Sequence, residues 1–141
     1  MNDKIREYVQ MWLNKGSNDL KNAEIILTVQ MQSPPLDTVC FHCQQAVEKF
    51  LKAYLVYHDK KFPYSHNLAD LVAECMQVDD SFVSIQRKAE TLTPFAVEIR
   101  YPDDFYMPSR KEAEAAFAIA VEIKNFIFTR LGDDFNRPES K

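Results

Sequence analysis

The sequence predicts an all-α protein, folded as an antiparallel up-and-down bundle of four to five helices. Apolar residues recur three and four positions apart over long segments, which is the period of an amphipathic helix. Only two glycines occur in 141 residues, where about 7% is typical, and this disfavours hairpins and glycine-rich phosphate loops. No segment has the alternating β-branched pattern of a strand.

The length and composition indicate one soluble domain, which we place at residues 1–131, with a polar C-terminal tail at 132–141. The net charge of −4 is unlike the overall positive charge of a protein that binds duplex nucleic acid. Three cysteines, an odd number, without a recognisable secretory leader indicate reduced thiols and a cytoplasmic location. Uncharged runs are much shorter than the roughly 20 apolar residues of a membrane span.

The first two helices follow from their apolar stripes. We expect the first at residues 3–31, continuous across the weak point at Gly16 because the stripe keeps its phase. Pro34 and Pro35 end that segment and suit the first turn of the second helix, at residues 36–58. The buried seam of this second helix is predicted to be Cys40, Cys43, Val47, Phe50, Leu51 and Tyr54.

The middle of the chain is predicted to form shorter helices. Ser65 is the expected cap of a third helix at residues 66–76. A fourth begins near residues 79–80 and breaks at Thr93-Pro94. With Thr93 as the cap and Pro94 at the first position, the helix is expected to restart there and to be stopped by Pro102.

The last helix has the clearest start and stop signals. Ser109 and Glu112 form a capping-box pattern at its start, and Gly132 is a C-terminal stop. Small residues on the helix seams would let neighbouring helices approach closely: Ala23, Ala46, Ala53, Ala116 and Ala120.

Cys40 and Cys43 are the first candidates for a chemical role, since two cysteines separated by two residues can ligate zinc or act as a redox pair. Zinc would need two further ligands, such as His66 or Cys75, recruited from elsewhere in the fold. Both cysteines fall on the predicted buried seam, where free cysteine behaves as a small hydrophobic residue. We therefore expect core packing and no metal site.

The second helix also carries a row of polar residues beside its buried seam: His42, Gln45, Lys49 and Lys52, which we call the polar flank. Their spacings of three, four and three place them on one face. They offer imidazole, amide and ammonium donors suited to phosphates or a base edge. The plain alternative is a solvated helix face with an internal Glu48–Lys52 pair.

A further cluster, Arg100-Tyr101-Pro102-Asp103-Asp104, lies at the predicted helix stop. An arginine at a helix C-terminus followed by proline is ordinary termination chemistry. Beside an irregular loop, the Arg100 guanidinium and the Tyr101 phenol would also suit a phosphate or a stacked base, with Asp103 next to them.

Several of these motifs occur in one order. A helix at 12–27 with an Asp19-Leu20-x-x-Ala23 core comes first. The run CFHCQQAVEKFLKA at 40–53 follows it, and then come HNL at 66–68, RYPD at 100–103 and an alanine-rich last helix. Over residues 12–131 this order resembles a prokaryotic HEPN domain, a small helical domain named for presumed nucleotide binding. The resemblance implies a helical bundle that forms a homodimer. It also implies pairing with a small nucleotidyltransferase, often as a toxin–antitoxin couple.

The resemblance also bears on catalysis. Many family members are metal-independent ribonucleases, with an arginine and a following histidine separated by four to six intervening residues. Arg100 matches the arginine, but Phe105, Tyr106 and Met107 occupy the positions expected for histidine. Without an imidazole the motif lacks a general acid/base of suitable pKa. We therefore expect no catalytic residue and no cofactor.

Three functional hypotheses follow. The preferred one is a dimeric module that binds nucleotide or RNA through the polar flank, Arg100, Tyr101 and Asp103, and acts with a nucleotidyltransferase. The second is an active ribonuclease toxin that uses Arg100 and a displaced base, such as His42 or His66. The third is a purely structural interaction domain in which the polar flank is a dimer rim.

Overall fold

The computed structural model describes residues 2–96 and 106–135, and this part of the chain is helical without strands. The prediction of an all-α bundle is therefore confirmed. The elements are α1 (Asp3–Thr28), α2 (Leu36–Tyr57), α3 (Leu68–Val78), α4 (Val83–Glu90) and α5 (Arg110–Leu131), with short 3-10 turns η1 (Asp80–Phe82), η2 (Thr93–Phe95) and η4 (Gly132–Asp134).

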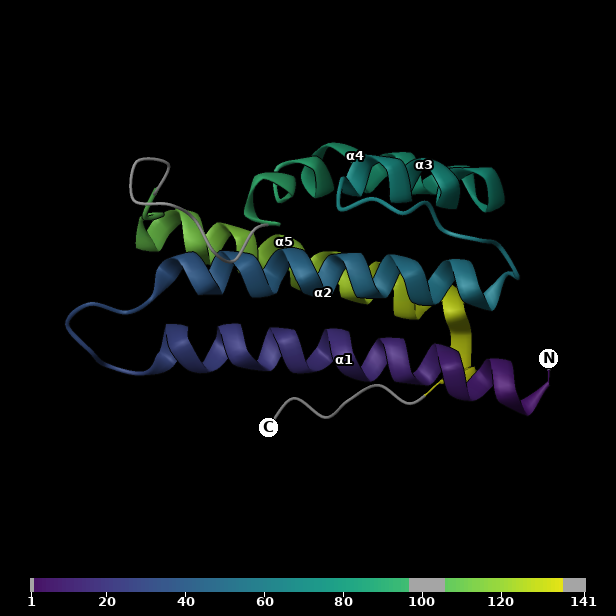
Figure 1. Cartoon of the computed structure of the whole chain (residues 1–141), viewed down its shortest axis with the longest axis horizontal. Coiled ribbons are helices and arrows are strands. Elements are labelled where there is room, and N and C mark those ends of the chain that lie inside the picture. The colour runs from purple at the N-terminus through teal and green to yellow at the C-terminus, as the bar shows by residue number, and fades with distance from the viewer. Residues whose placement is uncertain (1, 97–105, 136–141) are drawn as a thin grey trace.

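The three long helices lie side by side, with α2 between α1 and the α3–α4 pair and α5 packed along α2 (Figure 1). α1 and α2 are antiparallel. α5 runs in the same direction as α2, because the chain crosses back through the shorter α3 and α4 (Figure 1). α2 is therefore enclosed by the other helices, and its predicted seam is buried throughout.

α1 is continuous across Gly16, as the phase of its apolar stripe predicts. Gly16 is buried where α1 crosses α2, and a Cβ atom built on it would lie 2.8 Å from Cε1 of Phe50. Glycine therefore allows close approach here and does not break the helix. The seam alanines predicted to serve the same purpose are all buried: Ala23, Ala46, Ala53, Ala116 and Ala120.

The start of α3 differs from the sequence prediction. Its cap is Asn67, whose side chain accepts a hydrogen bond from the Ala69 backbone N–H, so His66 lies outside the helix. Ser65 instead accepts from the Asn67 N–H and donates to Asp70. The expected cap position was wrong because Ser65 and Asn67 are both good capping residues, and tertiary contacts select between them.

Thr93 also differs from its predicted role as the cap of its own helix. Its hydroxyl oxygen accepts a hydrogen bond from the Leu68 backbone N–H, at the first turn of α3. Thr93 therefore fastens the η2 turn to a neighbouring helix end. The helix predicted to continue toward Arg100 falls in 97–105, outside the described residues.

α5 begins and ends as predicted. Ser109 and Glu112 form the reciprocal capping box, and Gly132 follows the last turn with a positive φ of 75°. The fold continues beyond Gly132, because Phe135 is buried and its ring contacts that of Tyr57 at 5.5 Å. Residues 132–135 of the predicted tail are therefore described, and Phe135 among them packs in the core. Within the described residues, no helix is long and apolar enough to cross a membrane.

Candidate functional site

The polar flank is held in place by a carboxylate from the neighbouring helix. Asp19 on α1 accepts from the Lys49 ammonium at 2.6 Å and lies 3.0 Å from Nδ1 of His42 through its other oxygen. Only 11% of the Asp19 side chain is exposed, against 24% for each of its two partners. One carboxylate therefore fixes both an imidazole and an ammonium group at the α1–α2 contact.

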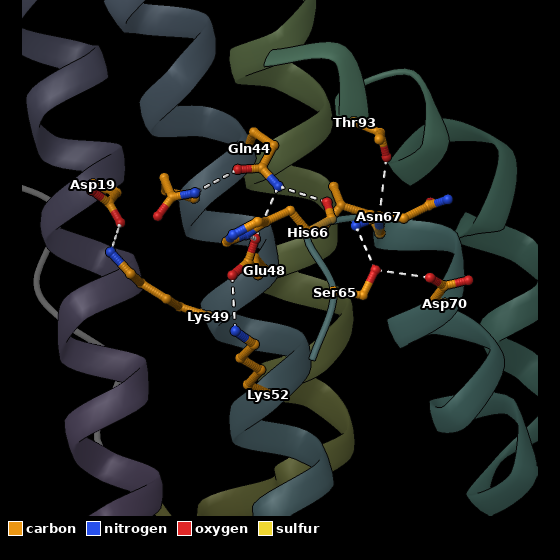
Figure 2. A network of polar contacts seen from close by, with 12 residues as sticks. Asp19, Gln44, Glu48, Lys49, Lys52, Ser65, His66, Asn67, Asp70 and Thr93 are labelled. Atoms are coloured by element: carbon orange, nitrogen blue, oxygen red, sulfur yellow. Dashed lines mark hydrogen bonds and ion pairs between the residues drawn. The ribbon is translucent and has the colours of Figure 1, made fainter. Parts of the chain in front are cut away.

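Glu48 is a second internal carboxylate, on α2 itself. Its oxygens lie 2.8 Å from Nζ of Lys52 and 3.1 Å from both Nδ1 of His66 and Nε2 of Gln44. Figure 2 shows these four side chains gathered between α2 and the segment before α3. Gln44 also donates to the His66 backbone oxygen at 3.3 Å. Glu48 thus ties α2 to the chain just before α3.

The charge of Glu48 is stabilised despite its burial. Burial by itself raises the pKa of this carboxyl, but hydrogen bonds from Lys52, His66 and Gln44 outweigh it, so the pKa lies below its usual value. Glu48 is therefore an anion at neutral pH. Its charge balances that of Lys52, as Asp19 balances Lys49.

His66 and Glu48 have unequal exposure. The His66 side chain is 72% exposed, whereas that of Glu48 is 6% exposed. A buried carboxylate beside Nδ1 orients the ring and leaves Nε2 on the solvent side. The network continues through Ser65 to Asp70 and through Leu68 to Thr93 (Figure 2).

Lys52 is the most enclosed cation of the polar flank. Its side chain is 14% exposed, and its ammonium group lies 5.1 Å from the ring centroid of Phe62 and 5.5 Å from that of Trp12. The two rings pack edge to face at 5.8 Å. Lys52 therefore combines an ion pair with two aromatic contacts, so its ammonium group stabilises the packing of these elements.

The predicted site residues are only partly brought together by the described structure. His42, Gln45, Lys49 and Lys52 share one side of α2, with Gln45 donating to Gln44 at 2.7 Å. Arg100, Tyr101 and Asp103 lie outside the described residues.

The positions expected for a catalytic histidine are described only in part. Phe105 falls outside the described residues, whereas Tyr106 and Met107 are exposed. The Tyr106 hydroxyl donates to Glu112 at 2.6 Å, and this bond raises the pKa of the phenol. Tyr106 therefore helps to secure the start of α5.

Sequence reasoning missed Asp19 as the anchor of the polar flank and the pairing of Glu48 with His66. Asp19 is 30 positions from Lys49, so only the helix crossing brings them together. The sequence did contain one indication of this role: Asp19 is the single carboxylate on the otherwise apolar side of α1 that faces α2.

The cysteines pack in the core, as predicted. Cys40, Cys43 and Cys75 are free and buried. Burial raises the pKa of Cys40 to about 11 and raises that of the other two thiols as well. Within the described part of the chain, no group of three or more His, Cys, Asp or Glu residues is arranged to hold a metal ion.

The fold and the site together define an all-α domain with a polar, carboxylate-anchored face on its central helix. The HEPN domain family matches residues 9–131, and the chain belongs to that family. No curated protein matches the chain.

Two solved structures are similar. The crystal structure of TT1696 from Thermus thermophilus has a TM-score of 0.71 and 26% identity, covering 84% of this chain and 94% of that one. ST0689, an archaeal HEPN homologue, has a TM-score of 0.68 and 21% identity, covering 87% of this chain and 97% of that one. The second similarity supports the fold alone.

Proposed function

We propose that this HEPN domain is a homodimeric module that binds nucleotide or RNA weakly through the polar flank together with Arg100, Tyr101 and Asp103. It acts with a small nucleotidyltransferase partner in a toxin–antitoxin type of system. The family membership motivates the dimer and the partner. The observation that carries the ligand class is the fixed row of imidazole, amide and ammonium groups on one side of α2.

The charge balance of the polar flank supports weak binding. Asp19 and Glu48 offset Lys49 and Lys52, so the flank carries little net positive charge. Phosphate binding depends on positive charge, so RNA binding is expected to be weak and to weaken further as the salt concentration is raised.

The test is fluorescence anisotropy with a labelled single-stranded RNA, at low salt and without metal. The Arg100→Ala and Gln45→Ala variants are expected to weaken binding, whereas Lys111→Gln at the exposed start of α5 serves as the control. Equal affinity for all four proteins would reject this binding surface. Light scattering of the same samples tests the dimer, and a monomer at high concentration would reject it.

The nucleotidyltransferase partner has its own test. The gene on either side is co-expressed with this chain, and the pair is purified through a tag on one member. A stable complex with a protein that carries a nucleotidyltransferase signature is the expected result. Neighbouring genes without that signature, or a pair that separates on the column, would reject the partnership.

A second candidate function is metal-independent RNA cleavage by Arg100 and a displaced base. The Glu48–His66 contact favours it, because a carboxylate that orients Nδ1 leaves Nε2 able to take the proton of a ribose 2′-hydroxyl. The 2′-oxygen then bonds to phosphorus while the bond between phosphorus and the 5′-oxygen breaks, and the departing 5′-oxygen takes a proton from water. RNA incubated with the protein in EDTA tests it. Cleavage lost in both Arg100→Ala and His66→Ala would establish the ribonuclease, and intact RNA would exclude it.

A further inference from the structure

A cluster of aromatic side chains lies where α1 meets the loop between α2 and α3. It consists of Tyr8, Met11 and Trp12 on α1 with Phe62 and Tyr64 on the loop, and we call it the aromatic patch. Tyr8 and Met11 are about half exposed and Tyr64 is fully exposed. Trp12 and Phe62 are partly buried and join this surface to the core. Tyrosine, tryptophan, phenylalanine and methionine are enriched at the centres of protein interfaces.

The α1 part of the aromatic patch faces away from the core. Tyr8, Met11 and Trp12 are spaced three and four apart and are therefore neighbours on the helix surface. At about 100° per residue, Met11 is roughly 200° around α1 from Val9, which is fully buried. Packing within the domain therefore does not account for these side chains, and contiguous exposed apolar surface of this kind marks interaction sites.

The rings of the aromatic patch are tilted and do not form a stack. The centroids of Tyr8 and Trp12 lie 6.1 Å apart with their planes at 59°, and those of Trp12 and Phe62 lie 5.8 Å apart at 85°. Single-stranded nucleic acids use ring faces on which successive bases stack. Tilted rings instead leave hollows between ridges, and such hollows suit the proline side chains of an extended polyproline II segment.

The two tyrosines also supply hydrogen-bond donors. The hydroxyl groups of Tyr8 and Tyr64 have no hydrogen-bond partner among the residues that the structure describes. The carbonyl groups of a polyproline II segment have no internal partners and can accept from them. The indole N–H of Trp12 is buried, so only its ring contributes to this surface.

Exposed lysines surround the aromatic patch. Lys4 and Lys15 lie one helical turn to either side of its α1 residues, and Lys61 is on the loop. Over residues 2–96 and 106–135, none of these three lysines forms an ion pair. The carboxylates of Glu7 and Asp59 are also nearby, so the lysines are in excess in a chain of net charge −4. This charge is complementary to an acidic ligand.

From the tilted rings, the free hydroxyl groups and the unpaired lysines, we infer that the aromatic patch binds an extended, acidic, proline-containing segment of a partner protein. The inference goes beyond the proposed function, because this contact needs neither RNA nor Arg100. A second copy of this chain fits less well, since a symmetric contact through the aromatic patch would bring like-charged lysines together.

The test is fluorescence anisotropy of the full chain with a labelled synthetic peptide, EEPPLPPEE, at low salt and pH 7. The double variant Tyr8→Ala/Tyr64→Ala is expected to weaken peptide binding about ten-fold, and it leaves the packing of Trp12 on Phe62 in place. The matched control, Ile25→Ala/Val83→Ala, removes two exposed apolar side chains outside the aromatic patch. The control is expected to stay within about two-fold of wild type.

Two further peptides separate the contribution of proline from that of charge. EEAALAAEE keeps the charge without proline and is expected to bind much more weakly than EEPPLPPEE. QQPPLPPQQ keeps the prolines, and Lys15→Gln/Lys61→Gln is expected to weaken binding of EEPPLPPEE while leaving that of QQPPLPPQQ unchanged. No binding of EEPPLPPEE by wild type, equal affinity for EEAALAAEE, or equal weakening by the tyrosine and control variants would each overturn the inference.

A competition experiment distinguishes the aromatic patch from the proposed RNA surface. Excess unlabelled decauridine is expected to leave the peptide bound, and Arg100→Ala is expected to leave peptide affinity unchanged. Failure of RNA binding alone would reject the proposed function while the peptide site stands. Decauridine that displaces the peptide, and that binds Tyr8→Ala/Tyr64→Ala more weakly than wild type, would assign the aromatic patch to RNA and overturn the inference.

Discussion

Replacing Glu48 with glutamine removes one charge from the centre of the polar network and keeps the side chain's shape. In the native protein this carboxylate meets Lys52 at 2.8 Å, and both His66 and Gln44 at 3.1 Å. Its side chain is 6% exposed and that of Lys52 is 14% exposed. Glu48→Gln would therefore leave an enclosed ammonium group without its counter-charge.

The expected loss can be bounded from these contacts. Removing one partner of a buried ion pair costs about 3–5 kcal/mol. Lys52 keeps its contacts with the Trp12 and Phe62 rings, and the glutamine oxygen still accepts one hydrogen bond. We therefore expect Glu48→Gln to lower the free energy of unfolding by about 2–3 kcal/mol.

Urea denaturation followed by circular dichroism at pH 7 measures this change. Glu7→Gln, an exposed position on α1, is the control and should change the unfolding free energy by less than about 0.5 kcal/mol. Lys52→Met and the double variant complete a double-mutant cycle, which should give a coupling of about 1–3 kcal/mol. A loss for Glu48→Gln no larger than that for Glu7→Gln would refute the role assigned to this network.

Three further predictions concern other parts of the fold and its pH dependence. The pKa of Glu48 is lowered in the folded state, so its contribution to stability is present above pH 4.5 and is lost as the pH falls through the lowered value. The unfolding free energies of wild type and Glu48→Gln, measured in urea, should therefore converge at acid pH. Gly16→Ala should destabilise by about 1–3 kcal/mol because its Cβ meets the Phe50 ring, and calorimetry showing stabilisation would contradict this. Native Cys40 should react with iodoacetamide at pH 8 about 100-fold more slowly than an ordinary thiol, as mass spectrometry can measure, because burial raises its pKa to about 11.

The local features of the fold were predictable because their signals lie close together in the sequence. The capping box joins Ser109 to Glu112, three positions apart, and the stripe of α1 keeps its phase across Gly16. Such patterns depend on helix period and backbone hydrogen bonding alone. The predicted starts of α1, α2 and α5 therefore agree with the structure. α3 starts at Leu68 after its Asn67 cap, α1 ends at Thr28 instead of residue 31, and α4 ends at Glu90, before the predicted break at Thr93.

The site was less predictable because its contacts join distant segments. The spacing of Lys49 and Lys52 correctly placed both on one face, but their partners differ: Glu48 is four positions from Lys52, whereas Asp19 is 30 positions from Lys49. The pairing of Asp19 with Lys49 does not follow from one helix considered by itself.

The most direct measurement for the proposed binding surface is an NMR titration of the 15N-labelled chain with a short single-stranded RNA. The proposal predicts shift changes for the Gln45 side-chain amide, for the backbone near Lys49 and for residues 100–103, and it predicts that these changes shrink as the salt concentration is raised. Shift changes confined to the outer faces of α3 and α4, or no change at RNA concentrations that saturate a weak site, would contradict it.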